Sequence, residues 1–292
     1  MLEGAAVGRP DNLERPIVSP ALDRVNDASS LASGADPGLL DAVLLELGLD
    51  PAGYRHVTAR PRQSLHQRVG ALGLEEGAYL ELLKSDQGER REALRRVAVT
   101  HTRFFRDRSL WEALAVHVLP AVVAARPLAR IWSAGTASGE EVLSVALLLE
   151  RLSLPGSVRL LGTDIREDLI ERACRGVYPG SSLCELPPDL RARFRAEGSG
   201  FALDAAVRSR VVLAPHDLMH DPWPWDVDLL LLRNLAFTCF GDAQRERVME
   251  GIEASLRSHS WLAIGARETL PRASAGRFER PFPGVPLWRR RN

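Results

Sequence analysis

The sequence predicts an α/β fold in which helices cover one twisted, doubly wound sheet, with a helical segment in front of it. From about residue 130 onward, short apolar runs typical of strands alternate with longer amphipathic runs typical of helices. The run Leu229–Leu232 is apolar without a break, as expected of a parallel strand that is buried on both faces. A glycine-rich turn, Gly135–Gly139, lies between the first strand and a helix. Open α/β sheets bind nucleotide-like ligands at such turns, so the sequence predicts a ligand site there.

The bulk composition excludes several classes of protein. The chain has 292 residues, no formal net charge and 45% hydrophobic residues, which is ordinary for a globular protein. No apolar run approaches the roughly 20 residues needed to span a membrane, and the start carries no secretory signal. Cys174, Cys184 and Cys239 form no C-x-x-C pair, which disfavours a disulfide framework. We therefore predict a cytoplasmic protein without membrane insertion or a nucleic-acid partner. Lys84, the only lysine, follows no glycine loop, so a Walker-type phosphate site is excluded.

Three parts follow one another along the chain. Residues 1–36 mix Gly, Pro, Asp, Ser and Ala without periodicity and are predicted to be a disordered leader. Residues 37–100 are predicted to form a helical domain, with helices at 39–47, at 63–72, at 76–83 and from 89. Residues 101–292 are predicted to form the α/β domain.

The expected elements of the α/β domain alternate along the chain. A helix over Trp111–Leu119 is expected to end at Pro120. Between about 176 and 212, prolines and short segments indicate a small inserted β-subdomain with a short helix at 190–195. The other expected elements are strands at 130–134, 158–164, 211–214, 227–232, 261–265 and 287–289, and helices at 168–174 and 243–256.

Arginines gather on the second expected helix and its approach. They are Arg55, Arg60, Arg62 and Arg68. Two interpretations stay open: a solvated face, or a docking surface for an acidic partner helix.

The residues around the glycine turn favour one kind of ligand. Glu140 and Glu141 begin the helix after the turn, where acidic side chains suit the positive end of the helix dipole but repel a pyrophosphate. NAD and ATP therefore fit poorly, whereas a ligand with a ribose and a cationic amine, such as S-adenosylmethionine, fits better. Asp164 ends the second strand, where a carboxylate can accept hydrogen bonds from both ribose hydroxyls.

The segment at the start of the α/β domain carries polar and aromatic side chains. Thr102 and Arg106 are four residues apart, so on a helical turn they would point the same way. An amphipathic linker held by a salt bridge is the alternative. Phe104 and Phe105 are adjacent and cannot share one helical face, so one of them is expected in the junction between the two domains.

Two His-Asp pairs follow the third expected strand. They are His216, Asp217, His220 and Asp221, residue types that bind metals. They precede Pro222, where no helix would align them. We therefore predict a polar loop near the adenine of the ligand and no metal site.

Five motifs in order resemble a known family. VAVTHTRFFRD, IWSAGTASGEEVLS, LLGTDI, LLRNLAF and GARETL are similar to those of the CheR-type chemotaxis receptor glutamate O-methyltransferases, over residues 37–291. The resemblance implies a class I S-adenosylmethionine-dependent methyltransferase domain, which is Rossmann-like with an antiparallel last strand. It also implies a small all-helical domain before it and an inserted β-subdomain. The implied activity is methyl transfer to glutamate side chains of a chemoreceptor-like protein, and the implied partner is an acidic helical protein. We expect the enzyme to be monomeric.

The resemblance also assigns roles to residues. Ala134 and Glu140 match contacts to the methionine part of the cofactor, and Asp164 matches the ribose acceptor. Arg106 matches the residue that contacts the cofactor and orients the substrate carboxylate, and it is the predicted catalytic residue. The full set of predicted cofactor contacts is Thr100, Thr102, Arg106, Ala134, Glu140, Asp164, Asp217, Leu218, Arg233 and Asn234.

Some positions depart from the family pattern. Thr100 and Asp217 stand where the family has asparagines, and Thr238 and Cys239 replace its aromatic pair. Ser258–Ser260 replaces a Gly-Gly turn before the late strand. Two alternatives therefore stay open: a cofactor-binding sensor or docking module without turnover, and a small-molecule methyltransferase.

The implied chemistry makes few demands on side chains. A glutamate with a pKa of about 4.3 is ionised at pH 7, so methyl transfer to it needs positioning and exclusion of water, but no general base. An arginine fork can hold the carboxylate in two hydrogen bonds. A neutral acceptor would need a base, for which His101, His216 and Asp217 are the candidates.

Overall fold

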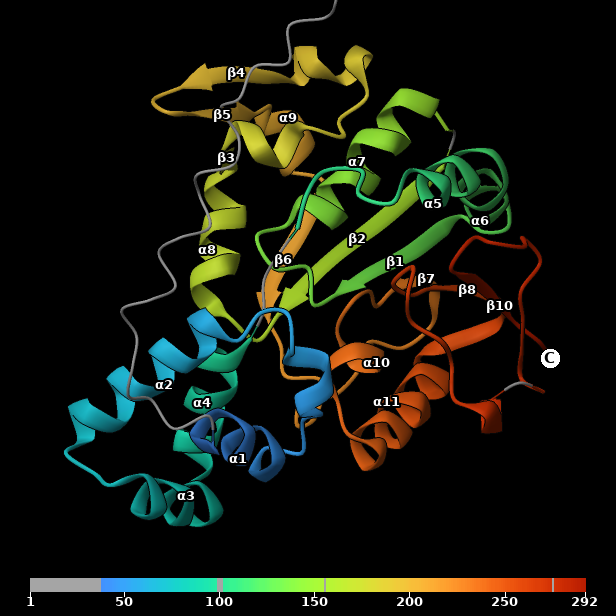
Figure 1. Cartoon of the computed structure of the whole chain (residues 1–292). Coiled ribbons are helices and arrows are strands. Elements are labelled where there is room, and N and C mark those ends of the chain that lie inside the picture. Colours follow the sequence, from blue (N-terminus) through green and yellow to red (C-terminus); the bar gives the residue numbers. More distant parts are fainter. Residues whose placement is uncertain (1–37, 99–101, 155, 275) are drawn as a thin grey trace, which may run out of the picture. The chain divides into compact units, whose positions relative to one another are not determined.

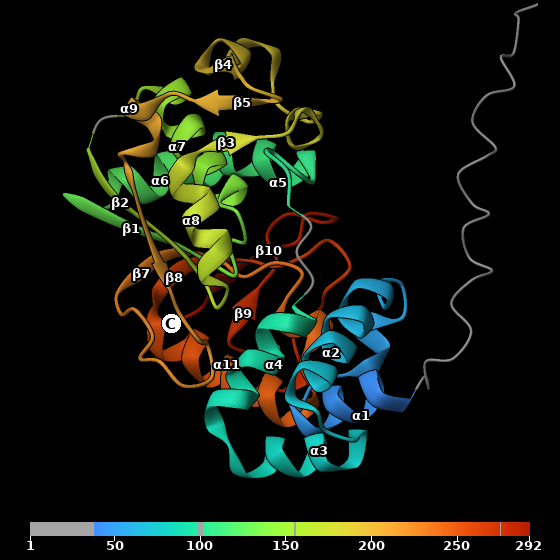
Figure 2. The same ribbon diagram turned by 90° about the vertical axis from the view of Figure 1, so that its left-hand side faces the viewer.

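The computed structural model describes residues 38–98, 102–154, 156–274 and 276–292. The predicted leader at 1–36 and the predicted site residue Thr100 lie outside these ranges, as does His101. Residues Gly38–Asn292 make up one compact unit, drawn in two views in Figures 1 and 2. None of the described helices has the length and apolar composition needed to cross a bilayer.

A seven-stranded sheet forms the centre of this unit. Its order is β6-β2-β1-β7-β8-β10-β9. The first five strands run parallel, and β10 pairs antiparallel with both β8 and β9. The strand order reverses between β1 and β7, so the predicted doubly wound sheet with an antiparallel last strand is confirmed. The strands are β1 (Leu128–Ala134), β2 (Ser157–Asp164), β6 (Val211–Pro215), β7 (Val227–Leu231), β8 (Leu256–Ala263), β9 (Phe278–Glu279) and β10 (Leu287–Arg290).

Helices cover both faces of the sheet (Figure 2). Successive side chains of a strand point to opposite faces, and the two hydrophobic cores follow this alternation. Ile131 and Leu229 share one core with α7, while Trp132 and Leu230 share the other with α11. The helices of the α/β part are α5 (Arg108–Ala113), α6 (Leu119–Ala124), α7 (Glu140–Leu152), α8 (Glu167–Arg175), α10 (Ala236–Cys239) and α11 (Asp242–Ser255).

The helical segment shares the core on the α11 side of the sheet. Its apolar residues, such as Leu65 and Tyr79, belong to the same cluster as Trp132. Backbone contacts also join it to the loop after α10: Leu49 forms a bridge with Phe240, and Gly241 N donates to Gly48 O over 2.8 Å. The elements of the segment are α1 (Gly38–Glu46), the 3₁₀ helix η1 (Pro51–Tyr54), α2 (Ala59–Leu72), α3 (Glu76–Ser85) and α4 (Gln87–Val97).

Between α8 and β6 along the chain, the residues form a separate three-stranded antiparallel sheet, as the sequence predicted. Its order is β3-β5-β4. The helix expected at 190–195 is instead the 3₁₀ helix η4 (Pro188–Arg193), because Phe194 already belongs to β4. The strands are β3 (Val177–Tyr178), β4 (Phe194–Glu197) and β5 (Gly200–Leu203), and the insert also contains η3 (Gly180–Leu183) and α9 (Ala205–Arg208).

Two expected chain breaks are absent. Pro120 does not end a helix, because a π-helical segment, Leu114–Val118, leads from α5 into α6. Pro120 lies in the first turn of α6, directly after the π segment, and a proline is tolerated in a first helical turn. Likewise, Ser258–Ser260 lies inside β8 as a bulge rather than before it as a turn, with His259 at φ 64°.

Both phenylalanines before α5 pack against the α/β part and its insert. The Phe104 ring meets the edges of Tyr178 and Phe194 at centroid distances of 4.9 and 5.1 Å. Phe105 lies 5.1 Å from Trp111. Neither belongs to the core that the helical segment shares, so the expectation that one lies in the domain junction is wrong. The positive φ of Phe105, 57°, turns the chain so that both rings enter one core.

Candidate functional site

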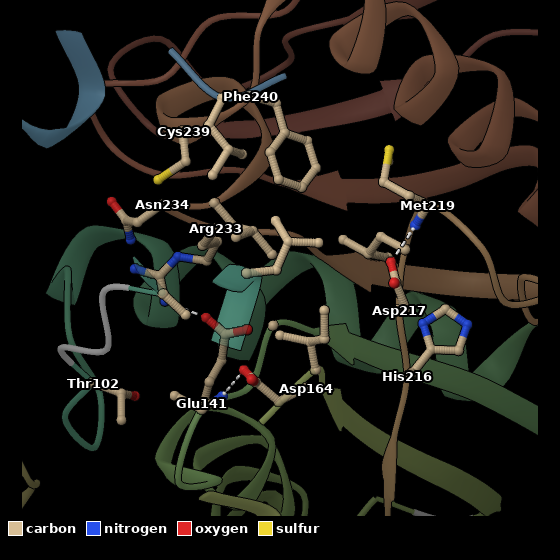
Figure 3. A pocket seen from close by; sticks show the side chains of 18 of the residues that line it. Thr102, Glu141, Asp164, His216, Asp217, Met219, Arg233, Asn234, Cys239 and Phe240 are labelled. Carbon is tan, nitrogen blue, oxygen red and sulfur yellow. Dashed lines mark hydrogen bonds and ion pairs between the residues drawn. The ribbon is translucent and has the colours of Figure 1, made fainter. Parts of the chain in front are cut away.

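The loops after β1, β2, β6 and β7 meet at the carboxyl ends of these strands. Strand register places Ala134 beside Thr163 and Asp164 beside Pro215. These loops and part of the helical segment line one cavity, here called the central cavity, which Figure 3 shows from close by. It lies beside β1, where the strand order reverses, as is usual for ligand sites in open α/β sheets.

The glycine turn and Asp164 hold each other in place. Gly135 N donates to Thr163 O over 2.8 Å, and Ala137 N donates to Asp164 Oδ2 over 2.8 Å. Gly135 has φ 73°, and a Cβ there would lie 2.6 Å from a methyl carbon of Leu235. Only glycine therefore suits this position.

Asp164 is a buried acceptor that faces the central cavity. Its Oδ1 accepts a hydrogen bond from Arg166 N over 3.0 Å, so each oxygen has one backbone donor. Burial raises the pKa of the Asp164 carboxyl above its usual range, although the backbone donors oppose this shift. A carboxylate offers about four acceptor sites, so Asp164 keeps capacity for donors on a ligand.

The loop after β6 is polar and internally bonded. Asp217 Oδ1 accepts from Met219 N over 2.8 Å, and Oδ2 lies 2.8 Å from His220 Nδ1. Asp217 N in turn donates to Asp221 Oδ2 over 2.8 Å. The predicted polar loop is therefore present, and no cluster of possible metal ligands occurs within the described ranges. His216 lines the cavity, and its buried Nδ1 has no hydrogen-bond partner.

Arg233 and Asn234 follow β7 and form another wall (Figure 3). Arg233 Nη1 donates to Glu141 Oε2 over 2.9 Å, while Nη2 contacts Asp107 Oδ2 and donates to the Arg106 carbonyl. Asn234 has φ 55°, and its N–H donates to Glu268 Oε2 over 2.8 Å.

Thr102 and Arg106 lie together, but not on a helix. The segment is a turn, since Phe105 and Asp107 have φ values of 57° and 68°, so the predicted helical geometry is wrong. Both residues line the central cavity and also a neighbouring opening, here called the side cavity, which Ser182 also lines. Thr102 and Arg106 therefore lie at the boundary between the central cavity and the side cavity.

Two predicted contacts do not line the central cavity. Ala134 is fully buried in β1. Glu140 is 1% exposed, and its two oxygens accept hydrogen bonds from Ser138 Oγ at 2.7 Å and Ser182 Oγ at 3.0 Å. Burial raises the pKa of Glu140, against the opposing hydrogen bonds. Glu140 bonds to Ser182, which lines the side cavity, and its neighbour Glu141 lines the central cavity. The predicted residues that do line the central cavity are Thr102, Arg106, Asp164, Asp217, Leu218, Arg233 and Asn234.

Sequence reasoning missed two residues of this region. Glu268 accepts from Gly265 N and Thr238 Oγ1 as well as from Asn234 N, over 2.6–2.8 Å, and thereby ties the loop after β7 to the end of β8. Glu268 belongs to the closing GARETL motif, but the sequence did not indicate its role. Tyr54 reaches the cavity from η1, a position that no sequence pattern indicated. Burial, chiefly, and the hydrogen-bonded Cys239 raise the pKa of Tyr54, and burial raises the pKa of Cys239 to about 11.

The lining of the central cavity fits a nucleoside that carries a positive charge. Three acidic residues line the cavity: Asp164, Asp217 and Glu141. Acidic side chains can accept hydrogen bonds from ligand hydroxyls and attract a cationic group of the ligand. The Nδ1 atom of His216, which has no partner in the protein, can form a hydrogen bond with the ligand. Leu218 and Phe240 supply apolar wall. Fold and cavity together define a nucleoside-cofactor-binding α/β protein.

Comparison with known proteins narrows this class. The family model described as "CheR methyltransferase, SAM binding domain" matches residues 100–281, more than half of the chain. The chain therefore belongs to the CheR methyltransferase family: it is an S-adenosylmethionine-dependent methyltransferase.

Several curated relatives are similar over most of the chain. A "Chemotaxis protein methyltransferase" of Listeria monocytogenes is 30% identical over 227 residues, 77% of this chain and 86% of that protein. "Chemotaxis protein methyltransferase 2" of Pseudomonas aeruginosa is 30% identical over 205 residues, 67% of this chain and 72% of that protein. An uncharacterized 104.1 kDa protein of Rhodobacter capsulatus is 29% identical over 91% of this chain, which spans only 27% of that protein's length.

Proposed function

We propose that the chain transfers methyl groups to glutamate carboxylates of a chemoreceptor-like protein. The names of the chemotaxis relatives support this substrate. The structural observation that carries it is that Arg106, a guanidinium side chain, lines both the central and the side cavity. S-adenosylmethionine supplies a methyl group on a cationic sulfur. An arginine at the boundary between the cavities suits an acceptor carboxylate that arrives from the other side.

Five of the predicted site residues have a task in this proposal. Asp164 accepts the ribose hydroxyls, while Leu218 and Asn234 contact the adenosine. Thr102 and Arg106 hold the cofactor near the acceptor, and Arg106 also orients the acceptor carboxylate. The remaining assignments, which rest on the family resemblance, are Thr100, Ala134, Glu140, Asp217 and Arg233.

One possible base is already engaged. Both carboxylate oxygens of Asp217 have hydrogen-bond partners, so this carboxylate is not arranged to take a proton from a neutral acceptor. An ionised glutamate needs no base, which agrees with this arrangement.

The structure separates the arginines near α2 into two kinds. Arg68 forms a bidentate ion pair with the buried Glu89, at 3.1 and 2.7 Å, and Tyr79 donates to the same carboxylate. It is therefore part of the helical core. Arg55 and Arg60 are exposed and Arg62 is half-buried. Helix α2 contains no acidic residue, so these three suit an acidic partner helix.

Reversing the charges of Arg55, Arg60 and Arg62 to glutamate should raise the KM for an acidic receptor fragment about tenfold at low salt, where screening is weak. Cofactor affinity should not change, because none of the three lines the central cavity. Initial rates at varied receptor concentration measure this effect. The matched control reverses Arg272, Arg280 and Arg291, which are also exposed. An equal rise in KM for both triple variants would refute docking at α2.

The identity of the product tests the proposed activity. Incubation with methyl-labelled cofactor and a glutamate-bearing receptor fragment should give a label that mild base releases as methanol, since esters hydrolyse and N-methyl or ether products do not. A base-stable label would show a different acceptor. S-adenosylhomocysteine binding without any transfer would instead show a sensor.

A further inference from the structure

The turn that carries Arg106 is conformationally unusual. Phe105 and Asp107, on either side of it, have φ values of 57° and 68°. Residues with a Cβ seldom adopt this region, and they keep it only where surrounding contacts enforce it. The contacts around the turn therefore determine where the Arg106 side chain points.

Three hydrogen bonds hold this backbone from the α/β side. Phe104 N donates to Ser182 O over 3.0 Å, and Phe105 N donates to Ser144 Oγ over 3.0 Å. Trp111 Nε1 donates to the Arg106 carbonyl over 2.7 Å. They fix one side of the turn and leave the cavity side to another group.

Arg233 holds the side of the turn that faces the central cavity. Its side chain is 3% exposed, and its Nη2 both donates to the Arg106 carbonyl at 3.1 Å and pairs with Asp107 Oδ2. Its Nη1 donates to Glu141 Oε2 at 2.9 Å, and Ser133 Oγ donates to Glu141 Oε1 at 2.7 Å. One guanidinium thus ties the turn to both β1 and α7.

Asp107 shows that this contact is specific. It occupies the N-cap position of α5, where aspartate normally accepts a backbone N–H of the first helical turn. Its side chain makes no such bond here, and its carboxylate pairs with Arg233. Asp107 does not line the central cavity, so its effect on the site must pass through the turn.

We propose that Arg233 and Asp107 form a clamp that positions Arg106 for methyl transfer. Arg233 is then a positioning residue whose guanidinium is engaged by protein groups, in addition to forming part of the cavity wall. This inference rests on the proposed function for its kinetic consequence, but the order of the turn itself can be measured without turnover.

Limited proteolysis measures the order of the turn. Trypsin cuts after arginine, and Arg103 and Arg106 both lie in the clamped segment. Asp107→Asn removes the charge of the clamp with little change in shape, so cleavage after Arg103, which does not adjoin the substituted residue, should become at least fivefold faster. The matched control is Asp228→Asn, whose carboxylate also pairs with an arginine, Arg126, at 3.0 Å and accepts from a backbone N–H. Unchanged cleavage in Asp107→Asn, or equal acceleration in the control, would overturn the clamp.

A double-mutant cycle measures the consequence for turnover. Asp107→Asn should lower kcat about tenfold while S-adenosylhomocysteine affinity, measured by calorimetry, stays within twofold. In an Arg106→Ala background the same change should lower kcat no further, because the clamp acts through Arg106. An additive loss in that background would overturn the proposal. If the parent protein transfers no methyl group, the proposed function fails, and the proteolysis result alone decides the clamp.

Discussion

Replacing Arg106 with alanine should lower turnover about a hundredfold. The guanidinium lines both cavities, and in the proposed function it holds the acceptor carboxylate in line with the methyl group. Loss of a hydrogen bond to a charged group costs about 1.5–3 kcal/mol, and misalignment adds to this loss. Since about 1.36 kcal/mol is a factor of ten in rate, kcat should fall by roughly two orders of magnitude in a methyl-ester assay.

Arg106→Lys is the conservative control. A lysine keeps the charge but not the planar fork that can hold a carboxylate in two hydrogen bonds, so it should restore little of the activity. Affinity for S-adenosylhomocysteine should fall less than kcat in both variants. A drop in affinity equal to the drop in kcat would mean that Arg106 acts on the cofactor and not on the acceptor.

Replacing Asp164 with alanine should weaken S-adenosylhomocysteine binding about a hundredfold. The buried carboxylate has acceptor capacity left after its two backbone hydrogen bonds, and both ribose hydroxyls can donate to it. Hydrogen bonds to a charged group are worth about 1.5–3 kcal/mol each. Calorimetry measures the effect, and unchanged affinity in Asp164→Ala would remove Asp164 from the binding site. NAD should not bind to the parent protein.

The pH dependence of binding offers a second measure of Asp164. Because burial raises the pKa of its carboxyl, protonation begins at a higher pH than for an exposed aspartate. A protonated carboxyl is a weaker acceptor, so affinity should fall as the pH decreases through that raised pKa. Asp164→Asn should weaken binding and remove this dependence, whereas an identical pH profile in parent and variant would assign the titration to another group.

The strands predicted from the local pattern of apolar residues agree with the structure where that pattern is pronounced. The apolar run Leu229–Leu232 lies in and just beyond β7, and the expected second strand matches β2 to within one residue. The errors occurred where tertiary contacts overrode a local rule. Pro120 would end an isolated helix, but packing of α5 and α6 against the core favours continuation through a π turn.

The class of sheet, the edge at which the central cavity lies and the carboxylate at that edge all followed from the sequence alone. Periodicity and the glycine turn are local features, and parallel strands necessarily bring their carboxyl ends together. Ordered motifs then pointed to the family. These inferences needed no knowledge of which distant residues meet.

Which side chains face the cavity depends on the packing of distant elements and could not be predicted from the sequence. Glu140 and Glu141 are adjacent on one helix, so their carboxylates diverge: Glu140 turns to Ser138 and Ser182, and Glu141 to Arg233. Tyr54 reaches the cavity, and Arg233 meets Asp107, across long stretches of chain. Contacts of this kind depend on packing between elements and on satisfying buried charges, neither of which is encoded in the spacing of neighbouring residues.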